Sequence, residues 1–240
     1  LRRDNVWLAL PPWPLVGPDQ RDIHDGFSVS NAETIYPAFW NHDSQHTVSL
    51  AQKPNMHLIP LHTAKKGRHL RNADRLWELA GTVLLCERLR VNTQRLVAIR
   101  VDKKVLTNTW WTFSLDKTPS KDVYEKALTL WLNSTCGIIL ILAHRVETQG
   151  AWVKFKKPSW MPMPVIDLNK LTQSQLDHLA SVYDSVADQV LQPFPQMEED
   201  EVRTTIDHGI EEALGLPDVS VLRHLLSREP VVCMKRIGER

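Results

Sequence analysis

The spacing of apolar residues predicts three helices in the middle of the chain. Apolar side chains recur at helical spacing over 72–85, where Asn72 is a suitable N-cap. The same periodicity predicts a helix over 121–132. Asn, Ser and Thr at 133–135 break that helix, and the Ser or Thr hydroxyl can cap a further helix that extends to about residue 145.

The other patterned segments read as extended chain. Prolines break any long helix in 1–60, which predicts irregular structure with short strands. Residues 95–101 and 108–115 are predicted as the two strands of a hairpin, with Asp102-Lys103-Lys104 as its turn. Apolar residues alternate with lysines over 152–157, which predicts a basic ribbon.

The last third of the chain carries strong helix boundary signals. Thr172 and Gln175 have the spacing of a capping box, which opens a helix predicted to reach about residue 191. Another helix is predicted over 198–214, and Gly215 is suited to end it. A shorter helix follows from Asp218.

These elements predict an α+β fold with two parts. A mixed domain of short strands and helices is expected over 1–166, and a helical segment over 167–240. The chain of 240 residues is long enough to bury a sizeable core. Its 42% hydrophobic and 24% charged residues are ordinary for a globular protein.

The net charge of +1 hides two regions of opposite sign. Residues 65–104 contain eleven Lys and Arg against four Asp and Glu. Residues 184–212 contain nine acids against one base, Arg203. We therefore expect a positively charged surface in the middle of the chain and an acidic helical segment after it.

Compartment and anchoring are predicted from simple features. The three cysteines, Cys86, Cys136 and Cys233, are isolated, which favours a reducing, cytoplasmic location without disulfides. No signal peptide and no membrane-spanning apolar run is evident, so no membrane partner is expected. The first residue is Leu rather than Met, and we expect the chain to be a piece of a longer protein.

Three basic segments are candidates for contact with DNA. Lys and Arg near a flexible Gly67 suit a phosphate track, whereas Arg with Asn suits the reading of base edges. Lysines interleaved with Trp152, Phe155 and Trp160 suit a nucleic-acid ribbon. The candidate residues of these segments are Lys65, Lys66, Arg68 and Arg71, then Arg88, Arg90, Asn92 and Arg95, then Lys154, Lys156 and Lys157.

Each basic segment also has a purely structural interpretation. The first could be a solvated surface loop, and the second a strand with an exposed polar face. The third could be a half-buried edge strand that its lysines protect from aggregation.

Catalytic and metal-binding patterns are missing from the sequence. It contains no Gly-rich cofactor loop, and Leu10-Pro11-Pro12-Trp13 lacks the Asn or Asp that would accept a hydrogen bond from a target amino group. His42 and His46 lie four residues apart, with His57 and His62 nearby, but no Cys or zincin Glu accompanies them. We expect no metal ion and no catalytic residue, although a metal enzyme or nuclease built on these histidines remains an alternative.

Several segments, taken in order, resemble N6-adenine DNA methyltransferases of the restriction-modification and phage-defence type. The segment ALTLWLNSTCG at 127–137 resembles the "aLxxxLNSxxG" element that lies behind the catalytic domain of those enzymes. It is followed by an Arg-x-x-Thr-x-Gly element that begins at Arg145. The other similar segments are 36–43 (YPAFWNHD), 87–93 (ERLRVNT), 108–111 (NTWW), 163–165 (MPV) and 200–207 (DEVRTTID).

The resemblance implies a target-recognition domain at 1–166 that binds double-stranded DNA, with Arg145 among the DNA-binding residues. It also implies a neighbouring methyltransferase catalytic domain as partner. That domain would bind S-adenosylmethionine, so no cofactor is expected in this chain. A non-enzymatic protein-interaction scaffold of a phage-defence complex is the alternative.

Overall fold

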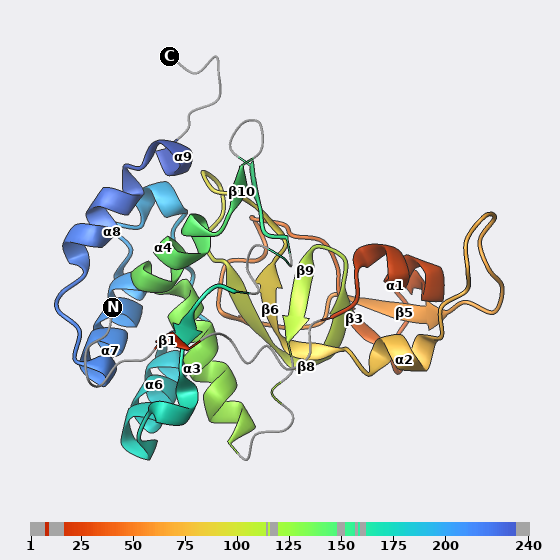
Figure 1. Ribbon diagram of the computed structural model, residues 1–240, viewed down its shortest axis with the longest axis horizontal. Helices are drawn as coiled ribbons and strands as arrows, with labels where there is room; N and C mark the ends of the chain where they lie inside the picture. The colour runs from red at the N-terminus through yellow and green to blue at the C-terminus, as the bar shows by residue number, and fades with distance from the viewer. Residues whose placement is uncertain are drawn as a thin grey trace.

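The chain folds as an α+β protein, as predicted (Figure 1). The computed structural model describes residues 8–9, 17–113, 115, 120–147, 152–156, 158 and 162–233. In chain order the elements are β1 (Leu8–Ala9), α1 (Gln20–Gly26), β2 (Phe27–Ser30), β3 (Pro37–Phe39), β4 (Ala51–Gln52), β5 (Met56–Pro60), α2 (Ala73–Trp77), β6 (Gly81–Cys86), β7 (Arg88–Arg90), β8 (Ala98–Thr107), β9 (Trp110–Phe113), α3 (Lys121–Asn133), α4 (Thr135–Ala143), β10 (Val146–Glu147), β11 (Trp152–Lys154), β12 (Val165–Ile166), the 3-10 turn η1 (Leu168–Lys170), α6 (Gln173–Val186), η2 (Phe194–Gln196), α7 (Glu201–Leu214), α8 (Ser220–Ser227) and α9 (Pro230–Cys233).

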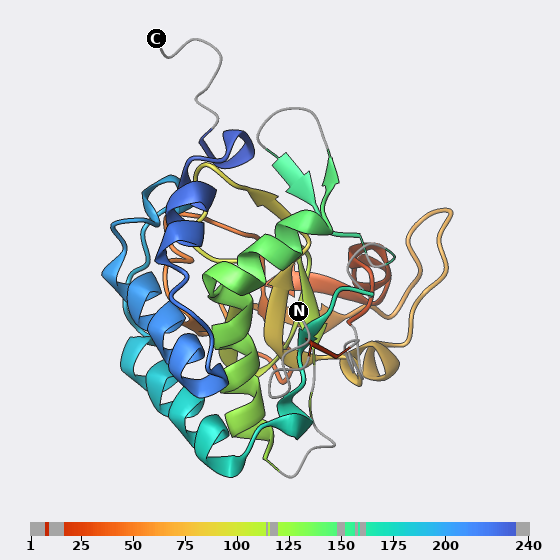
Figure 2. The ribbon, with the colours of Figure 1, turned by 60° about the vertical axis from the view of Figure 1, so that its left-hand side comes forward.

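A mixed seven-stranded sheet forms the centre of the molecule. Its strand order is β2-β5-β3-β8-β6-β9, and β4 adds a short parallel pair to β8. Strand β6 lies between β8 and β9 and is buried at all six positions. Helices α3, α4, α6, α7 and α8 lie on one side of this sheet, while α1 and α2 lie near β5 at the opposite end (Figures 1 and 2).

The predicted helix over 72–85 was wrong beyond residue 77. Asn72 does cap α2, because its side chain accepts a hydrogen bond from the Arg75 backbone N–H. Residues 81–86, however, form the central strand β6. A strand buried on both faces is apolar at successive positions, so periodicity alone does not separate it from a buried helix.

The predicted hairpin turn at 102–104 was also wrong, because β8 runs without interruption from 98 to 107. Its partner β6 pairs Gly81 with Val105 but Val83 with Arg100, so the charged residues occupy an irregular part of the ladder. The extra residues on β8 form a bulge-like region whose polar composition resembles that of a turn.

The helix caps in the second half were predicted correctly. Ser134 accepts a hydrogen bond from Gly137 N and caps α4. Thr172 and Gln175 form the predicted capping box of α6, and Gly215 ends α7 in the left-handed conformation with φ of 62°. Within the described residues no single helix has the length and apolar composition to cross a membrane, and only α3 and α4 together, bent by 71°, pass that test.

The apolar core continues across the predicted boundary at residue 166. One cluster of buried side chains extends from Phe39 in β3 to Val232 in α9. A smaller cluster joins α1, α2 and β5 around Phe27 and Leu58. The helices after 166 pack on α3, so they share the core of the sheet-bearing part.

Buried polar contacts hold the break between α3 and α4. The Asn133 amide accepts from Val97 N and donates to Ala98 O and Thr129 O at 2.8 and 2.9 Å. Its own carbonyl oxygen accepts from Arg203 Nη1 at 2.8 Å. Three of these four hydrogen bonds therefore link the end of α3 to β8, to the residue before it and to α7, and the fourth lies within α3.

The acidic partner in this network is Asp207 of α7. Its carboxylate accepts hydrogen bonds from Thr135 N and Thr135 Oγ1, both at 2.7 Å. Arg223 of α8 donates to the same carboxylate at 2.7 Å. Asp207 thus supplies an acceptor at the N-terminus of α4, where the helix dipole favours negative charge.

We expect Arg203→Met to destabilise the protein by about 3–5 kcal/mol, because it leaves the buried Asp200 carboxylate without its counter-ion and the Asn133 and Arg95 carbonyl oxygens without their donor. Guanidinium unfolding measures the change. Thr205→Ala, an exposed position on the same helix, should stay within about 0.5 kcal/mol of wild type. A loss below about 1 kcal/mol for Arg203→Met would contradict the role of the network.

Candidate nucleic-acid interface

A second, three-stranded sheet carries the most exposed group of cations with an aromatic neighbour. Its order is β10-β11-β7, all antiparallel, and it lies at the top of Figure 1. Leu89 of β7 and Val153 of β11 point inward and are buried. Successive strand residues point to opposite faces, so the flanking positions point outward. We name these outward residues and the next lysine the basic ribbon: Arg88, Arg90, Trp152, Lys154 and Lys156.

Strand register places two like charges directly opposite each other. Lys154 pairs with Arg88, and Trp152 pairs with Arg90. Side chains at such positions have Cβ atoms roughly 4.5–5.5 Å apart, and like charges there are destabilising. Among the described residues no acid forms an ion pair with any cation of the basic ribbon. Within the described residues, no ion pair therefore balances the positive charge of this surface.

The structural alternative for β11 does not fit its position. Lysines that protect an edge strand are expected on the last strand of a sheet. Strand β11 instead lies between β10 and β7. Phe155, just after the C-terminal end of β11, anchors the strand. Its N–H donates to Glu87 O, and its carbonyl oxygen accepts from the Trp111 indole.

The other residues predicted around this surface have different surroundings. Arg95 is half-buried and donates to Leu191 O at 2.7 Å, and Arg145 donates to Leu142 O at the end of α4. Asn92 is half-buried in the turn after β7. Lys157 lies outside the described residues. Arg95 thus holds a backbone carbonyl far away in the sequence, and Arg145 holds one that lies three residues before it.

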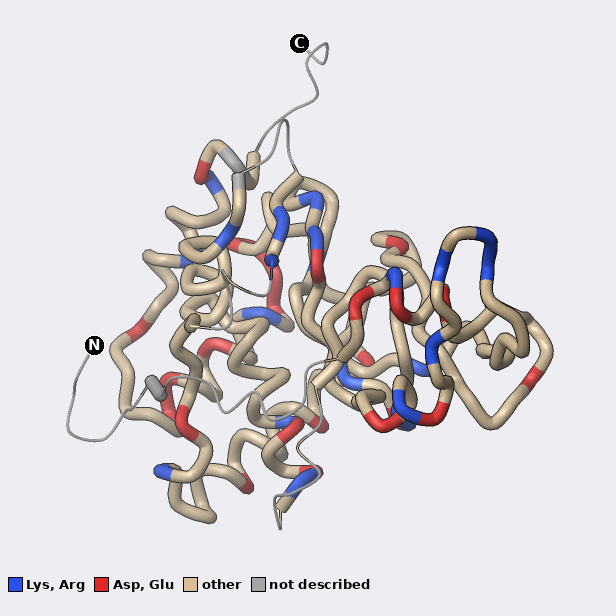
Figure 3. The backbone as a smooth tube through the Cα atoms, turned by 45° about the vertical axis from the view of Figure 1, so that its right-hand side comes forward, with Lys and Arg blue, Asp and Glu red and all other residues tan. Residues whose placement is uncertain are grey.

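The predicted loop Lys65, Lys66, Arg68 and Arg71 lies apart from the basic ribbon, at the far right of Figure 1. Arg68 and Arg71 form ion pairs with Asp25 and Asp22 of α1 at 2.6 and 2.9 Å. Burial first, and then Lys65 and Arg68, lower the pKa of His24. Figure 3 shows the two basic places separately, one on this loop and one on the small sheet. Lys66 is exposed beside Gly67, whose φ is 72°.

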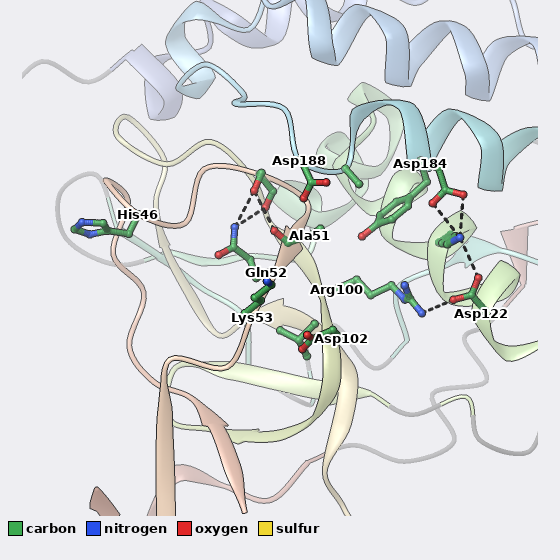
Figure 4. A pocket seen from close by; sticks show the side chains of 14 residues that line it. His46, Ala51, Gln52, Lys53, Arg100, Asp102, Asp122, Asp184 and Asp188 are labelled. Carbon is green, nitrogen blue, oxygen red and sulfur yellow. Dashed lines mark hydrogen bonds and ion pairs between the residues drawn. The ribbon is translucent and has the colours of Figure 1, made fainter. Parts of the chain in front are cut away.

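A cavity of about 660 Å³ lies between the sheet and the helices α3 and α6 (Figure 4). Two of its three lining Lys and Arg residues are already paired, Arg100 with Asp122 at 2.6 Å and Lys126 with Asp122 and Asp184 at 3.0 and 2.9 Å, and the third, Lys53, is exposed. Burial opposes the charge of Arg100, but Glu125 and Asp122 raise its pKa overall. Since these carboxylates neutralise both cations, the cavity is a poor site for a phosphate.

The four histidines considered as metal ligands have different surroundings. His46 pairs with Asp43 at 2.7 Å, His57 Nδ1 accepts from Thr34 N, and His62 is exposed. The His42 ring packs against Trp110 with centroids 4.3 Å apart. Within the described residues no three His, Cys, Asp or Glu side chains are grouped to hold a metal ion.

Comparisons with models of protein families, with curated proteins and with solved structures each found no match.

The surroundings of His42 make the stability of the fold depend on pH. Among the described residues neither buried ring nitrogen has a hydrogen-bond partner. Burial lowers the pKa of His42 from 6.5 to about 4, against the opposing effect of Asp43. Between pH 6.5 and about pH 4, His42 binds a proton more readily in the unfolded chain than in the folded one. The free energy of unfolding therefore decreases as the pH falls through this range.

We expect about 3 kcal/mol of stability to be lost through His42 between about pH 7 and about pH 4. Guanidinium unfolding across this range should show a smaller pH dependence in His42→Phe, which keeps a ring against Trp110 but does not titrate. His62→Gln changes an exposed histidine and should keep the wild-type dependence. Identical curves for wild type and His42→Phe would refute the assignment.

Proposed function

We propose that this chain binds double-stranded DNA as the target-recognition part of an N6-adenine DNA methyltransferase. The observation that carries the proposal is the exposed register pair Arg88–Lys154, two like charges opposed in a ribbon whose cations form no ion pair with the acids that the structure describes. Such an arrangement is unfavourable alone and becomes favourable when a polyanion lies across it. The class of enzyme is inferred from the segments that resemble N6-adenine DNA methyltransferases.

A duplex fits this surface in shape as well as charge. The major groove of DNA admits a two-stranded β-ribbon, and Arg can read guanine bidentately while Lys contacts phosphate. In this proposal Arg88 and Lys154 lie along one phosphate backbone, and Arg90 reaches a base edge. The loop with Lys66 would extend the contact to a second stretch of phosphates.

The methyl transfer itself would be the work of a partner catalytic domain with bound S-adenosylmethionine. This sequence contains neither a Gly-rich cofactor loop nor an Asn or Asp before Pro11-Pro12. The residues of the basic ribbon would hold the duplex and set its register for that domain.

Arg88→Gln with Lys154→Gln should weaken binding to all duplex sequences, because both residues lose their phosphate contacts. The slope of log affinity against log salt should shrink by about two units. Fluorescence anisotropy with a long duplex, begun at low salt, measures both quantities.

The matched control is Lys53→Gln with Lys103→Gln, which removes two exposed lysines outside the basic ribbon, one just after β4 and one in β8. This variant has the same net charge as the first, so a general charge effect would appear equally in both. Equal affinity and slope in the ribbon variant and wild type would sink the proposed interface.

A second candidate function, a protein-interaction scaffold, is favoured by one observation on α8. This helix buries Arg223 against Asp207 and turns apolar side chains to solvent. Val221, Leu222 and Leu225 are 67%, 44% and 59% exposed. An exposed apolar stripe on a folded helix is typical of a docking surface.

The charged residues near α8 indicate which kind of partner protein would bind there. Glu198 contacts His224 of α8 and Arg228 just after it, so the exposed Glu199 lies near the stripe, and Asp218 is exposed before the start of α8. The occupant that fits is a basic amphipathic helix of a partner protein, with its apolar face on the stripe.

Leu222→Ser with Leu225→Ser should reduce binding of a synthetic Leu/Lys amphipathic helical peptide by about tenfold, as expected for the loss of two apolar contacts. Calorimetry measures this binding. Val190→Ser, an exposed apolar position outside α8, is the matched control. If wild type binds no peptide while it binds DNA, the scaffold function is excluded in favour of the first proposal.

A further inference from the structure

The basic ribbon exposes an aromatic side chain that its own packing does not bury. Trp152 is 44% exposed and is the one aromatic residue among the large exposed hydrophobics of the described chain. Its neighbours Val153 and Phe155 on the same strand are 2% and 1% exposed, so these residues anchor the strand to the core. Nearly half of the Trp152 side chain therefore faces solvent on the outward side, where another molecule can contact it.

We propose that Trp152 stacks on an unpaired base of the bound DNA, an inference that rests on the proposed function and names its substrate class. In an intact duplex both faces of each base are covered by neighbouring bases. A base without a pairing partner can leave the stack and offer a free face. Aromatic side chains beside cations on strands are the arrangement that binds such bases, because stacking and phosphate contact act together.

The surroundings of Trp152 match this ligand. Arg90 lies directly opposite it across the strands, and the pair of Arg88 and Lys154 lies two residues further along. Two residues of strand span about 6.6 Å. A phosphate held by Arg88 and Lys154 would thus leave an adjoining base within reach of the indole, while Arg90 contacts its edge or the next phosphate.

Neither of the other polar regions offers the same combination. The loop with Lys65 and Lys66 has no exposed aromatic residue on it. The cavity beside Arg100 has Arg100 and Lys126 paired with carboxylates, and Tyr183, which lines it, is buried. The stacking surface and the free cations coincide at the basic ribbon.

The test compares three DNA probes of one sequence: an intact duplex, the same duplex with one bulged adenine, and its single strand. Wild type should bind the bulged duplex about 5- to 100-fold more tightly than the intact one. Trp152→Phe should keep most of this preference, and Trp152→Leu should lose it. Both variants should bind the intact duplex within about twofold of wild type, with an unchanged salt slope.

A reporter on the DNA separates stacking from a structural effect. The chain has nine Trp, so protein fluorescence is not specific, whereas 2-aminopurine at the bulge reports its own stacking. Its fluorescence should fall when wild type or Trp152→Phe binds and remain high with Trp152→Leu. Thermal melting of each variant checks that the fold is retained.

The possible failures are distinct. Salt-dependent binding of all three probes without a preference for the bulge, and without a fluorescence change, would overturn stacking and leave the proposed duplex interface intact. No DNA binding by wild type at low salt would overturn both. If Trp152→Leu fails to fold, a constant reporter signal with wild type still overturns the stacking proposal.

Discussion

A break between two buried helices leaves backbone groups that need partners, and here those partners come from a helix about seventy residues later in the chain. Asn133 ends α3 inside the core, and Thr135 begins α4 there. Arg203 and Asp207, one turn apart on α7, satisfy these two positions separately. The sheet, the helix pair and the C-terminal helices thus meet at one buried polar junction.

This junction also changes the interpretation of the acidic residues between 184 and 212. Nine acids between 184 and 212 suggested a solvated, negatively charged face. Asp200 and Asp207 are instead buried, where they accept hydrogen bonds from backbone and side-chain donors. Glu211 accepts from Val219 N before α8. Part of the negative charge is therefore structural, and less of it reaches the surface than the composition implies.

Features that depend on neighbouring residues could be predicted from the sequence, and features that depend on distant partners could not. The caps at Ser134 and Thr172 and the stop at Gly215 are local, because each is satisfied within a few residues. Strand β6 was mistaken for a helix because its pairing with β8 and β9 decides its conformation.

The same distinction applies to the candidate site. The cations of β7 and β11 were expected from composition, yet their register across the strands follows only from the fold. Arg95 looked equivalent to Arg88 in the sequence, but the carbonyl of Leu191, almost a hundred residues away, holds it. Arg68 and Arg71 looked free, but α1 provides their acids.

The small sheet has a simple division between inward and outward positions. Leu89 and Val153 provide its buried face, and Phe155 anchors it through one backbone hydrogen bond to Glu87, between β6 and β7, and one from the Trp111 indole of β9. Substitutions at the outward positions leave these anchors untouched. Lineages can therefore exchange the outward side chains freely under selection for new ligands, at little risk to the fold that presents them.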